Sequence, residues 1–507
     1  MLAGMVVLYF VVLIFGMVIK WEFWGQGYDQ VDYQQAIWNT TQGRPFQTSH
    51  YNFSNSFLGL DFAPGLLFAV PFYALWPSAY TLMVLQSALL ALGAVPVYLI
   101  ARDRFAIVSP AGNSGGEKAG LAWAAAYLLY PTLQFVNMSP PWQPRTLAIL
   151  CLLWSFYFFE RRRLLPFYLM LLIAVSTRTD TSLVVIAWGL LAALYRRGWR
   201  WWLPALALGF GWFYLSTEVI TPSFYREGYQ PTEGRVDFDP DAGQQSEAWP
   251  GPNPQLGYYA HLGKDPVDIV KNIAMRPGDT IRLMFTQQKL WYLSLMFGTL
   301  LFLPLFAPDV LLLCAPIFLI NLLSTRIYQY TIREQYQALI IPGIVLAGIV
   351  GSARLWMWLG SRVVSPAQAD PPASTMGRSV PTALLLGLMM VMGLLHLPLK
   401  NPVLSAIRYR EDPERVALME QLAEQIPPDA RVAATSFLAP HLLPRQFLIY
   451  LPPGPMHPKV DEAEYAFIDA RAQVLEAHPE LLTHLHSDPG WRLIAQQDEL
   501  LLFKQEP

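Results

Sequence analysis

The stretch from Leu2 to Gln35 reads "LAGMVVLYFVVLIFGMVIKWEFWGQGYDQVDYQQ" and joins a long apolar run to a polar segment with two carboxylates, Asp29 and Asp32. The apolar run is long enough to cross the roughly 30 Å hydrocarbon core of a bilayer as a helix. No basic segment precedes it and no small-residue cleavage site follows it, so we expect it to remain as the first membrane span. The two acids then lie just beyond a membrane surface.

The composition of the chain indicates a membrane protein. Hydrophobic residues make up 54% of the sequence and charged residues 14%, and the mean hydropathy is +0.31. These values lie outside the usual range of soluble globular domains. The net charge of −2 gives no sign of a nucleic-acid partner. Cys151 and Cys314 both lie inside apolar runs, which argues against a disulfide framework and a cysteine-ligated metal site.

Further apolar runs predict an all-α polytopic membrane protein with membrane lipids around it. About eleven runs are long enough to cross the bilayer as helices. They lie near residues 2–19, 79–101, 119–136, 146–159, 164–177, 181–195, 200–217, 289–306, 309–323, 337–358 and 380–398. The segment 61–76 is shorter and contains Pro64 and Pro71, so we expect an interfacial or re-entrant helix there.

Basic residues between the runs predict the orientation of the chain, because cytoplasmic loops of membrane proteins are rich in Lys and Arg. With a cytoplasmic N-terminus, alternation of the spans places all the basic groups in the cytoplasm: "ARDR" (101–104), "ERRR" (160–163), "RRGWR" (196–200), Arg354, Arg362 and Arg378. The same alternation places residues 20–78, the loop 218–288 and the chain beyond about residue 399 outside the cell. The acidic pair is therefore expected on the external face of a cell-membrane protein.

The C-terminal part of the chain has a different character. Charges are distributed throughout residues 399–507, which predict a small external α/β domain after a transmembrane domain of residues 1–398. The segment 412–426 has helical periodicity. Short apolar runs predict strands at 431–436, 446–451 and 465–470. The segment 491–505 predicts a closing hairpin.

The order of these features resembles the multi-span glycosyltransferases that use polyprenyl-phosphate-linked sugars, the superfamily of the protein mannosyltransferases and the aminoarabinose transferases of lipid A. Segments such as "YDQVDYQQAIWNTTQGRPF" (28–46) and "FYALWPS" (72–78) look most like a family of predicted membrane proteins, domain of unknown function 2079. The wider resemblance implies an integral membrane enzyme that moves a sugar from a polyprenyl-phosphate donor to an external acceptor. The donor sugar and the acceptor stay open.

The resemblance also implies an acidic site. The acidic motif of these transferases falls on Asp29, and Gln30 stands where the second acid is often found. Asp32 is the candidate for the missing carboxylate, because residues three apart share one face of a helix. A carboxylate at this place takes the proton of the acceptor or holds a divalent metal ion, which makes such an ion the candidate cofactor.

Two further segments match elements that contact the lipid phosphate in the resembling enzymes. "STRTDTSL" (176–183) occupies the place of a Thr-Lys-Gly-like element, so Arg178 would stand for its lysine. "IREQYQALIIPGIVLAG" (332–348) resembles the segment with a basic residue and a tyrosine, so Arg333 and Tyr336 are the matching positions. Guanidinium groups suit this role because their donors match phosphate oxygens.

Each of these residues also has a purely structural interpretation. Asp29 and Asp32 have the spacing of a helix N-cap and its third helical residue, close to a capping box. Arg178 can pair with Asp180, and Arg333 with Glu334. The missing second acid favours an alternative function, a non-catalytic membrane subunit or a transporter-like protein with the same architecture.

A metal site elsewhere in the chain is not predicted. We identify no third ligand near "HLH" (484–486) in the C-terminal domain, so a metal site is not expected there. "DFDPDAG" (237–243) departs from a calcium-binding loop, because Ala242 stands where the turn requires glycine.

Overall fold

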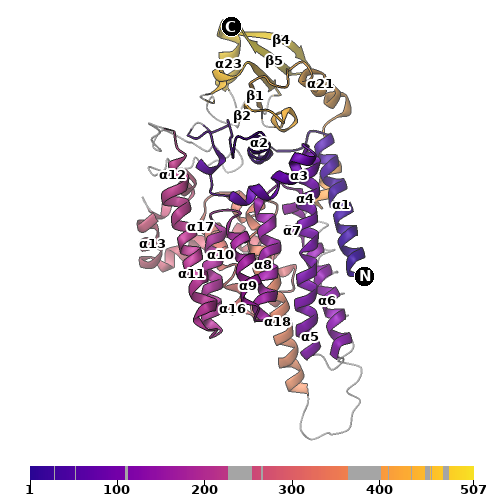
Figure 1. Cartoon of the computed structure of the whole chain (residues 1–507), viewed down its shortest axis with the longest axis vertical. Helices are drawn as coiled ribbons and strands as arrows, with labels where there is room; N and C mark the ends of the chain where they lie inside the picture. The colour runs from indigo at the N-terminus through magenta and orange to yellow at the C-terminus, as the bar shows by residue number, and fades with distance from the viewer. Residues whose placement is uncertain are drawn as a thin grey trace.

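The computed structural model shows a mainly helical chain with one small sheet near the C-terminus (Figure 1). Most of the span predicted at 380–398 lies outside the described residues. The segment 237–243, which was compared with a calcium-binding loop, also lies outside them. The structure describes residues 1–27, 29–51, 53–108, 112–226, 254–263, 266–363, 387, 401–408, 410–435, 437–451, 457, 459–471 and 479–506.

The first half of the chain forms most of the helical part (Figure 1). Several of its helices begin at proline, which fits a first turn because no N–H partner is needed there. The helices are α1 (Leu2–Glu22), α2 (Asp29–Thr41), α3 (Val70–Leu75), α4 (Ala79–Leu92), α5 (Ala94–Val108), α6 (Gly112–Leu129), α7 (Pro131–Met138), α8 (Pro144–Glu160), α9 (Leu164–Val175), α10 (Thr181–Leu194), α11 (Trp199–Tyr214) and α12 (Thr221–Ser223). Short helical turns lie at η1 (Phe57–Gly59), η2 (Pro64–Phe68) and η3 (Leu215–Ile220).

The second half adds shorter helices and one long one. Its elements are η4 (Pro254–Leu262), α13 (Pro266–Met275), α14 (Pro277–Met284), α15 (Gln287–Gly298), η5 (Leu303–Phe306), α16 (Pro308–Leu311), α17 (Ala315–Leu323), η6 (Ile327–Tyr330), η7 (Gln335–Gln337) and α18 (Ile340–Val363). Gly351 allows α18 to approach η5, because a Cβ atom at that position would lie 2.1 Å from the Leu303 carbonyl oxygen.

The number of predicted spans is not confirmed. Among the described residues, four helical stretches are long and apolar enough to cross a membrane: Leu2–Glu22, Ala79–Val108, Trp199–Ser223 and Ile340–Leu359. Several other apolar runs are divided, and so they do not form single long helices. The run 119–136 is interrupted before Pro131, and the run 289–306 leaves α15 at Gly298 to form η5. Hydropathy detects such runs but not the breaks inside them.

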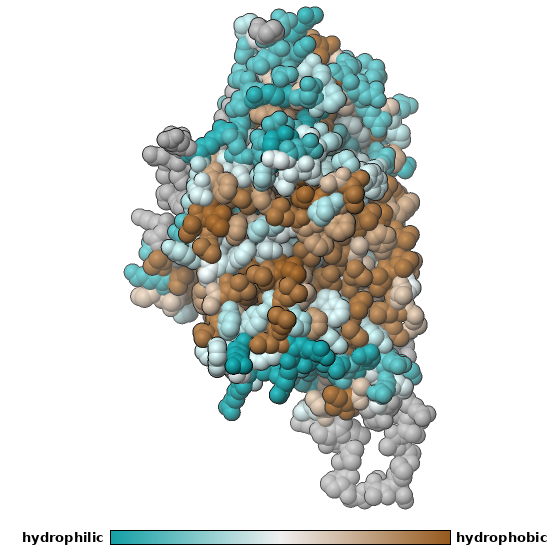
Figure 2. Space-filling view, viewed as in Figure 1, coloured by the Kyte–Doolittle hydropathy of each residue, from teal (hydrophilic) through white to brown (hydrophobic). Residues whose placement is uncertain are grey.

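The surface of the helical part suits a lipid environment. Figure 2 shows a hydrophobic band across the face in view, with hydrophilic residues above and below it. Leu8, Phe15, Leu165, Leu194 and Phe210 are large apolar side chains exposed on this part. A soluble monomer rarely exposes apolar surface on this scale. The band therefore indicates a membrane location for the helices.

The C-terminal end of α5 lies at the end of the helical part that is away from the sheet (Figure 1), and it carries the basic cluster 101–104. Arg161 forms an ion pair with Asp103, and Arg104 with Glu160. These pairs bring the predicted clusters 101–104 and 160–163 together. The arrangement agrees with the alternation used to predict orientation, while the side of the membrane on which this end lies stays a prediction.

The C-terminal part forms a five-stranded sheet within the described residues, in the order β2-β1-β3-β5-β4. Parallel pairing joins β1 to β2 and β3, and antiparallel pairing joins β5 to β3 and β4. The predicted C-terminal α/β segment is therefore present. Its elements are α20 (Pro402–Arg408), α21 (Pro413–Ala423), β1 (Val432–Thr435), η8 (Ala439–Leu442), β2 (Leu448–Leu451), η9 (Val460–Glu462), β3 (Tyr465–Asp469), α23 (Pro479–Ser487), β4 (Trp491–Gln497) and β5 (Leu500–Gln505).

Helices cover both faces of this sheet, which explains why β1 and β3 are buried along their whole length. Met419 of α21 belongs to a buried cluster on one face, and Leu485 of α23 to a cluster on the other. We call the sheet together with α21 and α23 the α/β unit. It lies directly over α2 in Figure 1.

Hydrogen bonds fasten the α/β unit to α2 and to the loop after it. Gln35 of α2 donates to the Gln446 carbonyl oxygen at 3.0 Å, and Ser49 Oγ donates to the Leu448 carbonyl oxygen at 2.8 Å. The buried Lys459 ammonium donates to the Ser49 carbonyl oxygen at 2.6 Å. The α/β unit thereby fixes α2 from above, and α2 carries the acidic pair.

Candidate functional site

Asp29 begins α2 and is held by a glutamine from a distant loop. Its Oδ2 accepts a hydrogen bond from Gln335 Nε2 at 2.8 Å. Gln337 stabilises that loop, because its amide donates to the carbonyl oxygens of Gln329 at 3.0 Å and Thr331 at 2.7 Å. The Oδ2 atom of Asp29 thus has a tertiary partner, which the capping interpretation did not foresee.

Asp32 lies in the same first turn of α2 and is 7% exposed. Gln30, which stands in place of the second acid, donates to Gln34 Oε1 at 2.6 Å. Gln34 in turn donates to the Tyr73 hydroxyl at 3.0 Å. Gln30 therefore belongs to a polar chain that links α2 to α3.

Arg178 connects three segments. Its Nε forms an ion pair with Asp61 Oδ2 at 2.5 Å, and its Nη1 lies 3.4 Å from the Tyr33 hydroxyl on α2. Asp61 Oδ1 accepts from the Thr179 backbone N–H at 3.0 Å and from its hydroxyl at 2.7 Å. Arg178, which lies in the α9–α10 loop, is therefore held between Tyr33 of α2 and Asp61 in the segment before η2.

Asp180 pairs with Arg145. The two side chains come from the start of α10 and the first turn of α8. The local pairing considered for Asp180 and Arg178 is thus replaced by two long-range pairs, because helix ends from different segments meet here. Arg145 is 6% exposed, so its charge lies inside the protein and not in solvent.

Arg326 is the arginine that packs against Tyr336. Its guanidinium carbon lies 5.0 Å from the ring centre of Tyr258, 5.7 Å from that of Tyr328 and 5.4 Å from that of Tyr336. Cations are attracted to aromatic faces at such distances. Arg333, the cation suggested by resemblance, lies exposed on the same loop.

Comparison with known proteins identifies the family. The model of the family described as "Predicted membrane protein (DUF2079)" matches residues 20–502. This chain belongs to the DUF2079 family. No curated protein matches its sequence.

Solved structures show a related fold. ArnT from Cupriavidus metallidurans in the apo state has a TM-score of 0.51 and 15% identity, over 99% of this chain and 98% of that chain. ArnT bound to undecaprenyl phosphate gives 0.48 and 14% over the same shares. The oligosaccharyltransferase AglB from Archaeoglobus fulgidus, in complex with an inhibitory peptide and a dolichol-phosphate, gives 0.46 and 10% over 92% and 70%. The DUF2079 chain therefore has an ArnT-like, glycosyltransferase-like fold.

Burial shifts the pKa values of two carboxyls at the site of this DUF2079 protein upward. Burial raises the pKa of Asp29, while the hydrogen bond from Gln335 and the nearby charges of Arg326 and Arg178 oppose that rise. Burial together with the charge of Asp29 raises the pKa of Glu334 to about 7. Raised carboxyl pKa values suit groups that exchange protons near neutral pH.

The sequence did not predict a place in this site for Asp61, Arg145 or Arg326. It also did not predict that Glu334 is a neighbour of Asp29. Asp61 was visible only as an acid ahead of the Pro64 helix, and Arg145 only in the turn "PPWQPR" (140–145). Neither has a short-range partner. What could have identified them is that each is a charged residue beside an apolar run. Such a position indicates a functional or paired group but does not identify the partner.

The described residues bring three potential metal ligands together in one group only, and that group lies in the α/β unit at Asp461, His484 and Asp488. Beside Asp29 the described acids are Glu334 and Asp32. A divalent ion at Asp29 would have to complete its coordination with water or substrate oxygens, as hard cations with few carboxylate ligands do.

Proposed function

We propose that this protein transfers a sugar from a polyprenyl-phosphate-linked donor to an acceptor on the external face of the cell membrane. One observation carries the proposal: the partly buried carboxylate of Asp29 lies close to cations from three other segments, Arg326, Arg178 and Lys20, and accepts a hydrogen bond from Gln335. Figure 1 shows α2, which begins at Asp29, between the helical part and the α/β unit. ArnT, which the chain resembles in fold, binds undecaprenyl phosphate.

The roles follow from charge and position. Asp29 takes the proton of the acceptor hydroxyl or amine, because it is the carboxylate with a raised pKa that the Gln335 amide orients. Arg178 and Arg326 stabilise the negative charge that develops on the departing phosphate. Tyr336 and Arg333 line the same side, with Tyr336 holding Arg326 in place. Asp32 supports Asp29 from the next position on the helix face.

Ion-pair partners that hold an arginine in one orientation help such a site to stabilise developing negative charge. Asp61 holds Arg178 by its Nε edge. A cation that is already oriented needs little rearrangement when charge develops, which lowers the barrier more than a mobile side chain can. The polyprenyl tail would lie along the hydrophobic band, beside η2 and α3.

The test is Asp29→Asn in the purified protein in lipid nanodiscs, with a panel of undecaprenyl-phosphate-linked sugars and release of undecaprenyl phosphate as the readout. Asn keeps the volume and the acceptor oxygen for Gln335. Transfer should fall by about a hundredfold or more, the usual scale for a lost general base. Asp279→Asn is the matched control, since Asp279 is an exposed acid in the first turn of α14. Equal release by both variants and wild type would exclude Asp29 as the base.

A second function is favoured by a specific observation. Arg145 and Arg178 are both neutralised by carboxylates, Asp180 and Asp61. A site whose buried cations are already paired fits a non-catalytic subunit or a transporter-like protein that kept the architecture. In that case wild type itself would release no undecaprenyl phosphate from any donor, although the folded protein would still bind the lipid.

A further inference from the structure

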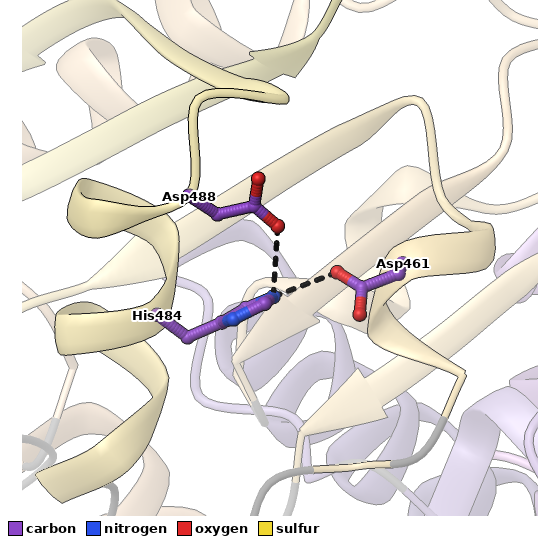
Figure 3. Close-up of side chains that lie close together, drawn as sticks. All are labelled: Asp461, His484 and Asp488. Carbon is purple, nitrogen blue, oxygen red and sulfur yellow. Dashed lines mark hydrogen bonds and ion pairs between the residues drawn. The ribbon is translucent and has the colours of Figure 1, made fainter.

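Three potential metal ligands converge in the α/β unit, away from the site around Asp29. Figure 3 shows Asp461, His484 and Asp488 with their polar atoms turned toward one another. His484 Nε2 lies 2.7 Å from Asp461 Oδ1 and 3.8 Å from Asp488 Oδ2. All three ligand atoms lie within 4.8 Å of one another. In the sequence Asp488 stands four residues after His484, whereas Asp461 is 23 residues away and is brought to the group only by the fold.

The fold presents these ligands from two elements. His484 lies on α23, and Asp488 directly follows the helix, where its N–H donates to the His484 carbonyl oxygen at 2.9 Å. Asp461 comes from η9. The indole N–H of Trp491 donates to Asp461 Oδ1 at 3.2 Å, and the Gly490 N–H donates to Asp488 Oδ1 at 2.8 Å. Such outer contacts orient ligand side chains in metal sites.

Two carboxylates lie near one nitrogen of His484, although a single hydrogen bond from that nitrogen needs only one of them. One imidazole N–H is satisfied by Asp461, yet Asp488 also directs an oxygen at the same nitrogen. Two carboxylates around one imidazole nitrogen concentrate negative charge at that point, and a bound divalent cation would neutralise this charge. In a tetrahedral zinc site with bonds of about 2.0–2.2 Å, ligand atoms lie roughly 3.3 Å apart. The two observed distances bracket this value.

We propose that Asp461, His484 and Asp488 bind one Zn²⁺ ion, with water in the fourth position. Zinc fits best because the set combines one imidazole nitrogen with two carboxylate oxygens and has the span of a tetrahedral site. Binding replaces the proton on His484 Nε2 and joins α23 to η9. The ion would then stabilise the side of the α/β unit where the helix packs on the sheet.

The experiment uses the full-length protein in detergent, treated with EDTA and then dialysed against buffered Zn²⁺. Wild type should retain one zinc per chain, measured by mass spectrometry of the metal, and zinc should raise its unfolding temperature. His484→Gln and Asp461→Asn should each weaken binding at least about tenfold in competition with a colorimetric zinc chelator, because each removes a ligand.

His486→Gln is the matched control. His486 lies on the same helix but packs edge-on against Phe503 at 5.1 Å, outside the ligand group. It should retain zinc like wild type. Equal zinc retention by His484→Gln and wild type would overturn the proposal, and so would loss in His486→Gln alone, which would indicate adventitious binding by surface histidines. If one ligand variant fails to fold, the other and Asp488→Asn give the same reading.

Discussion

At the scale of single residues, Glu334 is the carboxyl whose protonation responds most directly to the site. Burial and the neighbouring charge of Asp29 raise its pKa from the ordinary 4.5 to about 7. The folded protein therefore keeps a proton that the unfolded chain releases at lower pH. Stability conferred by the neutral form is present below about pH 4.5 and is lost as pH rises toward about 7.

Glu334→Gln should abolish this pH dependence, because glutamine stays neutral and keeps a similar shape. The unfolding temperature of wild type should fall relative to that of Glu334→Gln between pH 4.5 and pH 7, by an amount on the order of 1 °C, and the difference should level off above pH 7. Differential scanning fluorimetry of both proteins across this range is the measurement. Parallel curves would show that Glu334 ionises in the folded protein as it does in water.

At the scale of elements, α2 is positioned from two sides. Below it, Tyr33 contacts Arg178 and Asp29 binds Gln335. Above it, the α/β unit binds Gln35 and the loop that follows α2. Because α2 carries the acidic pair, the geometry of the candidate site depends on contacts made by β2 and by the residues before β3.

Lys459→Met should loosen this upper attachment. The Lys459 ammonium is 2% exposed and donates to the carbonyl oxygens of Ser49 at 2.6 Å and Tyr51 at 2.5 Å. Methionine leaves both oxygens buried without this donor, at a cost of roughly 1–3 kcal/mol. Limited proteolysis should cut between residues 47 and 57 several times faster than in wild type.

Lys504→Met is the control for that experiment. Lys504 is exposed on β5, where its ammonium lies 5.7 Å from the ring centre of Tyr465. A surface change of this kind usually alters stability by less than about 0.5 kcal/mol. Indistinguishable cleavage of Lys459→Met and Lys504→Met would mean that the loop is held by its other contacts.

At the scale of the whole molecule, a hydrophobic band separates two hydrophilic ends (Figure 2). In Figure 1, α2 and the α/β unit lie at one end and the C-terminal end of α5 lies at the other. Ion pairs join the basic clusters 101–104 and 160–163 at that second end. The positive-inside rule assigns the basic end to the cytoplasm. We therefore predict that the α/β unit and Asp29 are external, where an acceptor outside the cell would reach them.

Single cysteines test this orientation in intact cells with a membrane-impermeant thiol reagent. Gln425→Cys in the α/β unit should be labelled, and Ser114→Cys at the basic end should be protected; both positions are exposed in the structure. The natural Cys151 and Cys314 are buried and give the background. Labelling of Ser114→Cys with protection of Gln425→Cys would invert the orientation and place the site in the cytoplasm.

The sequence by itself determined the local features of this protein. Apolar runs predicted a helical membrane part, and short apolar segments after residue 430 predicted the strands that form β1 to β5. These features depend on the pattern of side chains within one segment, and such a pattern is visible in the sequence. The predicted number of spans is not confirmed, because prolines and short turns divide several apolar runs without changing their hydropathy.

Only the tertiary structure decided which charged groups meet. Arg178 pairs with Asp61 and not with Asp180, Arg326 and not Arg333 packs on Tyr336, and Asp461 faces His484. Each pairing joins segments that are separate in the sequence, and no periodicity records it. The energy of a buried charge depends on the partner that folding brings within a few ångströms. For that reason the residue types of the site could be anticipated from the sequence, while its partners could not.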